Sequence, residues 1–571
     1  AAHENAACFA DVTTSPHASS SSHGLLLAAH VASMPFQYFR DATVAREAAH
    51  PAAERLGASL VAPKLIPALA AAAAAAPSDR DAAQFARVAF KVVFRLVRAH
   101  MPAAIAPSLP AVVGAIESAC AVDVDQAGGF ESEISWVAAK RALRLGAALV
   151  TRHADALDAG SISSLARSGR AIAAAKPGVA PAPCVAAAFA LLRATLERAA
   201  TRDALLFRRE SVPEPEPTSK SSDEKASARL ALARLVRACV VPHVSLTDED
   251  EASLASDPEE YARANACGEA AEDDAVEDAL DGNVSGVTAR GAALEFLEAL
   301  ARVSFDANKR EEDGVTNGAA EKKPRKGERR DEKPEDEDDA PGSAKPTLGE
   351  LAARDVVDEM LAAAPKEKVE KVGKAAGAAG ATVAHAAPAA EAALGASAYF
   401  GALRVQGALT AASRRAKESA TRSFCRKHAF PAVAAAASPH VVVAAAAHCA
   451  DVAAKVTTAA VAREAFAALV AALERPTPAP SDEMDEEETE EAWRVTRDAA
   501  SWAARALVSE APCADEAFGE AAFFESLAER LVKRAEATPA RGAAPLRALA
   551  ALAEAASGAV APGAAAALAA R

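Results

Sequence analysis

Residues 85–105 carry two apolar stripes at helical spacing, and this limits what the chain can fold into. The first stripe is Phe85, Ala89, Val92 and Leu96, and the second is Phe90, Val93, Val97 and Met101. A helix that is apolar on two faces must be covered on both sides. Stacked helix pairs provide such cover, because each pair packs between the pair before it and the pair after it.

Proline spacing indicates the length of such a repeat. Pro67 (LIPAL) and Pro110 (SLPAV) occupy similar places in successive predicted helices and lie 43 residues apart. This spacing fits the length of about 40 to 47 residues of HEAT and armadillo units. Comparable helices recur at Pro242 and Pro431, and residues 426–456 read as a whole repeat with a Ser-Pro turn between two helices. We therefore predict an all-α, right-handed α-solenoid of HEAT/armadillo-like repeats.

Composition agrees with an all-helical chain. Aromatic residues make up only 4% of the sequence, and alanine and other good helix formers dominate it. A chain of 571 residues is too long for one compact core, so it must form several domains or an extended array.

Changes in composition divide the chain. We predict helical repeats at 23–211, 226–305, 348–475 and 492–571. Between them we predict a disordered N-terminus at 1–22, a linker at 212–225, a disordered charged insertion at 306–347 and an acidic loop at 476–491.

Charge and cysteine usage narrow the function. The net charge of −15 disfavours nucleic acid as a partner and suits partners with basic patches. The eight cysteines lie far apart with no C-x-x-C pair, which is typical of reduced, buried thiols. The apolar run at 61–77 is interrupted by Pro63, Lys64 and Pro67, so we predict no membrane insertion and no signal peptide.

Residues 246–263 (LTDEDEASLASDPEEYAR) form the acidic segment, which is the candidate site. Its carboxylates are Asp248, Glu249, Asp250, Glu251, Asp257, Glu259 and Glu260. We predict that Asp257 and Pro258 open a new helix, with the two following glutamates near the positive end of its dipole. Two interpretations are open: a capped helix start on a solvated face, or an exposed surface that binds a partner.

Several blocks resemble the importin-β family of nuclear transport receptors, the karyopherins, and most closely the N-terminal half of its importin seven/eight branch. The acidic segment with its DPEEY is one. The others are HGLLLAAHVASMPFQYF, FKVVFRLVRAHMP, SWVAAKRALRL, GALRVQGAL and HAFPAVAAAASPHVVVAAAAHCADV, in the family's order over residues 23–510. The chain begins without Met, and we expect it to be a fragment.

The resemblance implies a function and partners. They are import of basic protein cargo into the nucleus, release by Ran-GTP, contact with nucleoporins, and a monomer that moves between nucleus and cytoplasm through the nuclear pore. Members of the family contact Ran-GTP through an opening domain that has no counterpart before residue 23. A HEAT-repeat scaffold of a stable complex, without Ran dependence, is therefore the alternative.

Signatures of enzymes are missing from the sequence. We find no phosphate-binding P-loop, no nucleophile elbow and no H-E-x-x-H helix. His153 with Asp155 and Asp158 comes nearest to a metal-ligand spacing, and a helix end explains this group better. We expect no enzyme activity, no cofactor and no metal.

Overall fold

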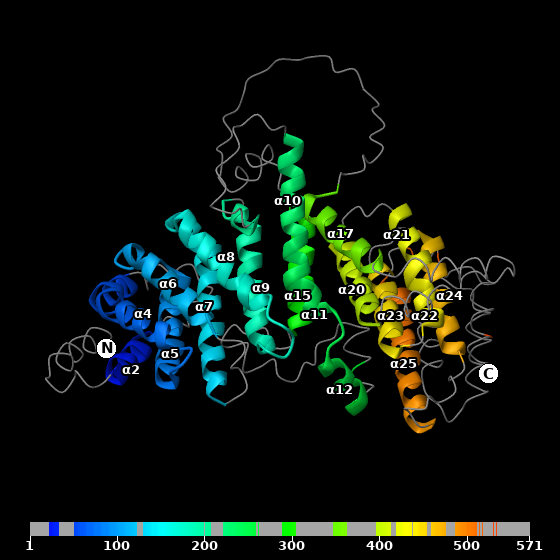
Figure 1. Cartoon of the computed structure of the whole chain (residues 1–571), viewed down its shortest axis with the longest axis horizontal. Coiled ribbons are helices and arrows are strands. Elements are labelled where there is room, and N and C mark those ends of the chain that lie inside the picture. The colour runs from blue at the N-terminus through cyan, green and yellow to red at the C-terminus, as the bar shows by residue number, and fades with distance from the viewer. Residues whose placement is uncertain are drawn as a thin grey trace, which may run out of the picture.

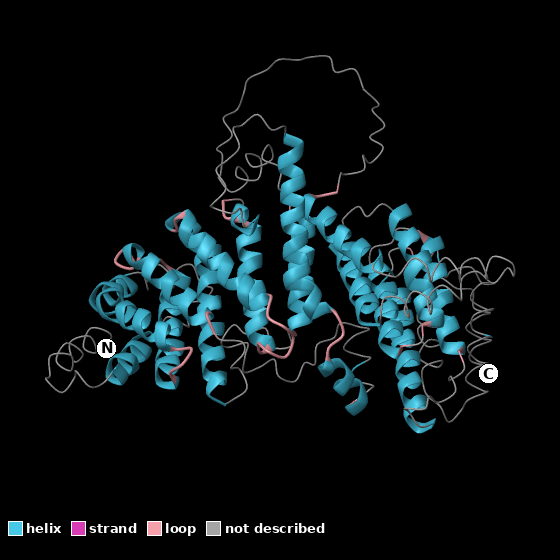
Figure 2. Cartoon of the chain, in the orientation of Figure 1, coloured by secondary structure: helices cyan, strands magenta, loops and turns pink. Residues whose placement is uncertain are grey.

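The computed structural model describes the helical body of the chain. The described residues are 22–33, 51–122, 130–198, 200–206, 221–257, 261, 288–303, 346–362, 396–412, 418–436, 438–453, 458–475, 486–510 and the single residues 513, 517, 529 and 533. Within these ranges all regular structure is helical, without a strand (Figure 2). The prediction of an all-α fold is confirmed.

The helices form two rows that run along the long axis of the molecule (Figure 1). One row consists of α4 (Ile66–Ala75), α6 (Leu109–Cys120), α8 (Ala159–Ala173), α10 (Ser221–Leu235) with α11 (Val241–Val244), α17 (Leu348–Ala362), α21 (Glu418–Phe424) with α22 (Phe430–Ala435), and α24 (Ala459–Glu474). The other consists of α2 (Ser22–Ser33), α5 (Arg80–Ala99), α7 (Phe130–His153), α9 (Ala182–Glu197), α15 (Ala289–Arg302), α20 (Ala396–Ala412), α23 (Pro439–Ala453) and α25 (Glu486–Glu510).

Helices pack both within and between the rows. In the first row, contacts join α4, α6 and α8, then α10 and α17, and then α22 and α24. In the second row, contacts run from α2 through α5, α7, α9, α15, α20 and α23 to α25. Helix α5 contacts α2, α4 and α7, and both stripes predicted for it lie in the interior except at Met101, which is half-buried. The expectation that this helix is covered on both sides is confirmed.

Prolines mark one row of helices. Pro67, Pro110, Pro242 and Pro431 are each the second residue of a helix, in α4, α6, α11 and α22. A π-helical turn comes directly before three of these helices: η3 (Gly57–Leu65) before α4, η8 (Val236–Val240) before α11 and η11 (Cys425–Ala429) before α22. A proline has no N–H and crowds the carbonyl four residues earlier, so a helix bends or widens there.

Three predicted boundaries are wrong. Residues 221–225, assigned to the linker at 212–225, begin α10. Residues 486–491, assigned to the acidic loop at 476–491, begin α25. Thr347, assigned to the insertion at 306–347, caps α17, because its Oγ1 accepts from the Glu350 N–H and donates to the Ala301 carbonyl. A polar composition alone therefore does not end a helix in this chain.

Other predicted segments lie outside the described residues. They are 1–21, 212–220, 306–345, 476–485 and nearly all of 511–571.

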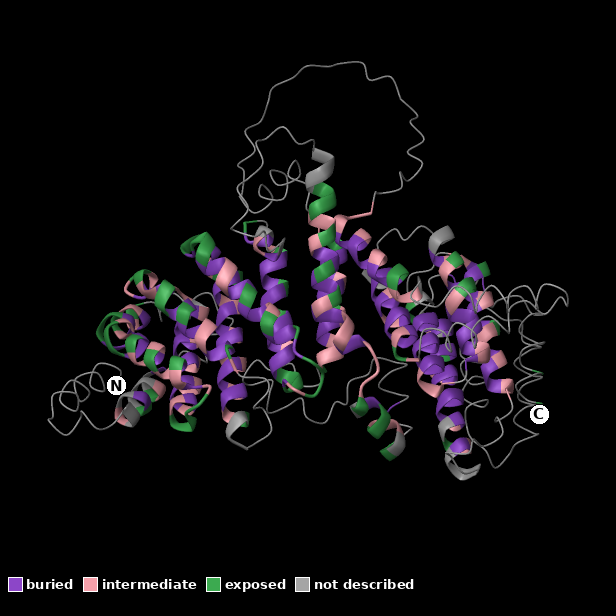
Figure 3. Cartoon of the chain, in the orientation of Figure 1, coloured by how far each residue is buried: buried purple, intermediate pink, exposed green. Residues whose placement is uncertain are grey.

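Apolar side chains form two clusters of buried residues along the array (Figure 3). The first extends from α2 to the later part of α20, where it includes Val405 and Leu409. The second begins in α20 at Tyr399 and Phe400 and continues through α25. Helix α20 therefore joins the two clusters.

The described tryptophans and cysteines lie in the interior, and for the cysteines the sequence analysis expected this. Trp136 and Trp493 are buried, and Trp502 is half-buried against the second cluster. The described cysteines are free thiols in buried positions: Cys120, Cys184, Cys239, Cys425, Cys449 and Cys513.

One described helix, Pro51–Ala75, is long and apolar enough to cross a membrane by length and composition. Within this helix, α4 packs on α5 and α6 of the array, and a third of the most apolar window is buried.

Candidate functional site

The acidic segment begins with a short capped helix, α12 (Asp248–Ser256), in the connection between α11 and α15 (Figure 1). Thr247 is its N-cap. The Thr247 N–H donates to Asp250 Oδ2 at 2.9 Å, and the Asp250 N–H donates to Thr247 Oγ1 at 3.3 Å. This reciprocal pair is a capping box, which satisfies two N–H groups that a helix start otherwise leaves open.

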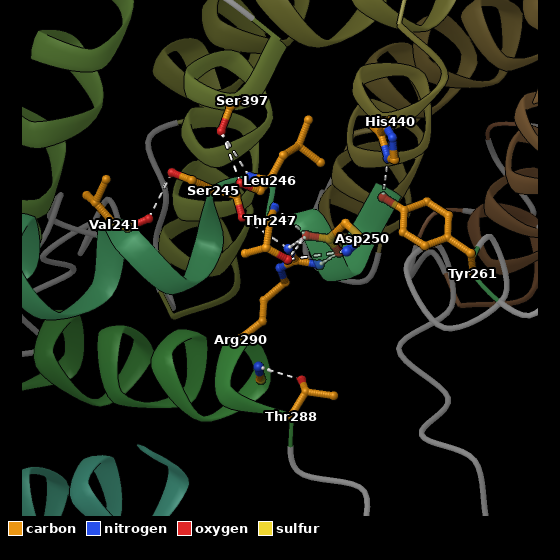
Figure 4. Close-up of polar contacts among 11 residues, drawn as sticks. Val241, Ser245, Leu246, Thr247, Asp250, Tyr261, Thr288, Arg290, Ser397 and His440 are labelled. Carbon is orange, nitrogen blue, oxygen red and sulfur yellow. Dashed lines mark hydrogen bonds and ion pairs between the residues drawn. The ribbon is translucent and has the colours of Figure 1, made fainter. Parts of the chain in front are cut away.

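A buried ion pair fixes the start of α12 to the array (Figure 4). Arg290 Nη1 donates to Asp250 Oδ1 at 2.7 Å, and Arg290 Nη2 donates to the other carboxylate oxygen. The second nitrogen also donates to the Ser245 carbonyl at 3.1 Å. The Asp250 and Arg290 side chains are 9% and 16% exposed, so the pair is largely shielded from water. Such a bidentate pair fixes orientation as well as distance.

The guanidinium group of Arg290 also lies over an aromatic ring of α20. Its guanidinium carbon lies 5.0 Å from the centre of the Phe400 ring, and that of Arg404 lies 5.3 Å from the same ring. Burial lowers the pKa of Arg404 to about 10, and the charge of Arg290 acts in the same direction. Two cations therefore contact one ring of α20, and one of them, Arg290, also pairs with the Asp250 carboxylate.

The far end of the segment is fixed to α23. Tyr261 is buried, and its hydroxyl lies 2.7 Å from His440 Nδ1 (Figure 4). Burial lowers the pKa of His440, although the charges of Asp250 and Glu251 oppose this. The ring is therefore neutral, and its Nδ1 shares this hydrogen bond with the Tyr261 hydroxyl. Before α12, the Leu246 N–H donates to Ser397 Oγ of α20 at 3.1 Å.

These anchors span the junction of the two buried clusters. Arg290 comes from α15, which lies in the first cluster, and His440 comes from α23, which lies in the second. Leu246 and Leu254 pack on the second cluster from the side of the segment. The acidic segment is thus held at both ends against three helices.

The carboxylates of the segment differ in exposure. Asp248, Glu251 and Asp257 are exposed, whereas Asp250 is 8% exposed. Burial alone would raise the pKa of Asp250, but hydrogen bonds and charge from Arg290 outweigh it and hold this pKa below its usual value. Asp250 therefore remains charged although it is buried, and its ion pair with Arg290 stabilises the fold.

The structure adds one helix and corrects one prediction. The helix that starts at Asp248 was not predicted, and Thr247 supplies its cap. The second helix, predicted to open at Asp257 and Pro258, has Pro258 outside the described residues, and the Tyr261 N–H donates to the Asp257 carbonyl at 3.0 Å, as in a helical turn. Asp250 was assigned to an exposed partner-binding surface, and it is instead paired with Arg290. The side chain of Glu249 and residues Glu259 and Glu260 lie outside what the structure describes.

Sequence reasoning missed Arg290, Phe400 and His440. Arg290 lies 40 residues after Asp250, and His440 lies 179 residues after Tyr261, so no local pattern links them. The T-x-x-D of Thr247 and Asp250 was the one local signal, because it has the spacing of a capping box.

Among the described residues, no group of three or more His, Cys, Asp or Glu side chains could hold a metal ion. His153 ends α7, and Asp158 caps α8 by accepting from the Ser161 N–H, so this trio marks two helix ends.

No protein-family model matches the chain, and no curated protein matches its sequence.

Proposed function

We propose that the two rows of helices form a right-handed α-solenoid of HEAT- or armadillo-like repeats. Support comes from the continuous packing of neighbouring helices along the second row and from their contacts with helices of the first row. The recurrence of a proline as second residue in α4, α6, α11 and α22 adds to it, because equivalent residues recur in equivalent helices of a repeat array.

On this framework, the protein acts as a nuclear transport receptor of the importin-β type. It binds basic protein cargo, releases the cargo when Ran-GTP binds, and contacts nucleoporins as it passes between cytoplasm and nucleus. It works as a monomer, without a cofactor and without nucleic acid or membrane insertion. The family resemblance of the sequence blocks provides the particular partners, and the acidic segment provides the surface.

One observation carries the proposal: the exposed carboxylates belong to the acidic segment, and both ends of this segment are held against the helices. Asp248, Glu251 and Asp257 belong to the same stretch as the buried anchors Asp250 and Tyr261. A partner that meets preorganised charges loses less conformational freedom on binding. Complementary charge also speeds the encounter, in a way that weakens with salt.

The test separates exposed carboxylates from anchors. In the full chain, Asp248, Glu251 and Asp257 are changed to Lys, and binding to a Lys/Arg-rich peptide and to GTP-loaded Ran is titrated at two ionic strengths. We expect at least about tenfold weaker binding at low salt, since several charges act on one partner, and unchanged helical circular dichroism.

A matched control changes Glu133, Asp155 and Asp358 to Lys, because these are exposed carboxylates elsewhere on the array. Equal weakening in both triple variants would contradict a local binding surface. Binding of the peptide that persists undiminished when GTP-loaded Ran is added would favour the alternative, a HEAT-repeat scaffold of a stable complex.

A further inference from the structure

A broad basic hollow lies at α21 and η11, on the opposite edge of the array from α12 (Figure 1). Its volume is about 520 Å³, and the described residues that line it are Arg422 and Ser423 of α21 with Arg426 and Lys427 of η11. Three of these side chains are cations. Such a cluster contrasts with the net charge of −15 of the whole chain.

Helical spacing places the four side chains next to one another. Arg422 and Arg426 are four residues apart, and so are Ser423 and Lys427, so the members of each pair are neighbours along the helix surface. Ser423, Arg426 and Lys427 are exposed, and Arg422 is half-buried. The cluster is therefore a surface that a partner can reach.

Glu464 of α24 holds the two arginines in place. Its Oε1 accepts from Arg422 Nη2 at 2.8 Å, and its Oε2 accepts from Arg426 Nε at 2.6 Å. Arg426 Nη2 also donates to Oε1, so this arginine binds the carboxylate through two nitrogens. Burial alone would raise the pKa of Glu464, but the hydrogen bonds and charges of both arginines outweigh it and lower this pKa. The carboxylate therefore remains charged and orients both guanidinium groups.

Glu464 balances one of the three positive charges. Arg422 donates to it through one nitrogen and Arg426 through two, whereas a guanidinium group has five N–H donors. Lys427 forms no ion pair with a described residue. The cluster therefore keeps positive charge and hydrogen-bond donors for a second anion. A partner that meets groups already fixed in orientation loses less conformational freedom on binding.

We propose that this hollow is a docking surface for an acidic segment of a partner protein, whose aspartate or glutamate side chains contact Arg426 and Lys427. Carboxylates fit arginine well, because its planar donors bind both oxygens at once. The surface is independent of the proposed receptor function, since it takes a partner of the opposite charge and uses other helices.

The chemistry of the hollow favours a peptide over other ligands. Sites for small molecules are mostly apolar and enclosed, whereas this hollow is open and is lined by charged and polar side chains. A nucleic acid carries a continuous row of phosphates, which would also meet the negative charge of the rest of this chain. A short acidic segment can bind the cluster without that repulsion.

The test measures binding of labelled probes to the full chain by fluorescence anisotropy, at low and at physiological ionic strength. The probes are a glutamate-rich peptide, the same peptide with glutamine at every glutamate, and a single-stranded RNA. The variant is Arg426→Gln with Lys427→Gln, which leaves the ion pair of Arg422 with Glu464. Lys427→Gln alone serves in case the double variant folds poorly.

The matched control is Lys176→Gln with Arg234→Gln, which removes the same charge from exposed positions outside the hollow. We expect the wild type and the control to bind the glutamate peptide alike, more tightly than the glutamine peptide, and more weakly as the ionic strength rises. The double variant should bind it at least about fivefold more weakly, because two of the three cations are removed.

The proposal is overturned if the wild type does not prefer the glutamate peptide to the glutamine peptide. Equal weakening in the control and in the double variant also overturns it, because the binding would then depend on overall charge. So does tighter binding of the RNA than of the glutamate peptide, since the cluster would then serve a nucleic acid.

Discussion

Two acidic runs of similar composition have different structural roles. In residues 248–251, a threonine cap starts a short helix, and the third carboxylate is buried against Arg290. In residues 486–491, the acids begin the 25-residue helix α25, and Glu490 pairs with Arg497 two turns later on the same helix at 2.8 Å. One run is fixed by a distant part of the chain, and the other by its own helix.

The difference shows that a run of carboxylates does not define a binding surface. The environment of each member decides whether it serves folding or remains exposed. In the first run Asp248 and Glu251 remain exposed beside a buried Asp250. In the second, Glu491 makes an exposed pair with Arg494, whereas Glu490 shields the buried Arg497.

Lowering the pH should have the largest effect on the stability of the fold. It acts on α23, the helix that contacts the supports of both acidic runs. Helix α23 packs on α20 and α25, and burial lowers the pKa of His448 in α23 and of His428 nearby to about 4. Because these values lie below the unfolded value, stability is present above about pH 6.5 and is lost as the pH falls towards 4. We expect a loss of roughly 3 kcal/mol for each histidine.

Urea unfolding at a series of pH values measures this loss. The variant His448→Gln should flatten the pH dependence between pH 6.5 and 4. A loss confined to pH values below 4 would instead assign the acid sensitivity to carboxylates such as Asp250, whose folded pKa is lowered.

Asp250→Ala tests the distant anchor of the first run. It removes the capping box and leaves Arg290 without its carboxylate, so we expect the region to lose about 3 kcal/mol of stability. Hydrogen exchange of α12 measures the change, with Asp248→Ala as the exposed control within about 0.5 kcal/mol. Equal effects of the two substitutions would remove the distinction between buried and exposed members.

Tyr261→Phe tests the other end of the segment. It deletes the hydroxyl that hydrogen-bonds to His440 Nδ1 and leaves this half-buried ring without that partner, so we expect a loss of about 1 to 2 kcal/mol. Thermal unfolding and hydrogen exchange around Leu246 would detect it. If only α23 responds and α12 does not, the two ends of the segment are independent.

Glu490→Gln and Glu491→Gln sharpen the comparison within the second run. Glu490 pairs with a buried arginine, so its change should cost about 1 kcal/mol. Glu491 makes an exposed pair, which contributes about 0 to 0.5 kcal/mol. The urea midpoints of the two variants measure these losses of stability. A larger loss for Glu491→Gln than for Glu490→Gln would show that the exposed pair contributes more than the pair with the buried arginine.

Much of the fold could be predicted because its signals are local. Apolar stripes such as that from Phe85 to Leu96 report which faces are covered, and prolines such as Pro67 and Pro110 mark equivalent helix positions. Boundaries were harder to predict. The polar residues 221–225 and 486–491 have a composition suited to loops, but they form the first turns of α10 and α25.

The candidate site was predicted only in part, for a physical reason. Its location in the acidic segment follows from the sequence. Which of its carboxylates are buried and which are exposed depends on Arg290 and His440. Those contacts form only when helices distant in sequence are stacked. A buried ion pair of this kind has no sequence period that could reveal it.

The π turns before Pro67, Pro242 and Pro431 also change the phase of their helices. Each residue advances an α-helix by about 100°, so a turn that takes up an additional residue rotates every later side chain relative to those before it. The two parts of such a helix can then direct their apolar stripes at different neighbours. Deleting one residue from η8 should restore a single phase and rotate the buried His243 and Val244 out of register with α8 and α15.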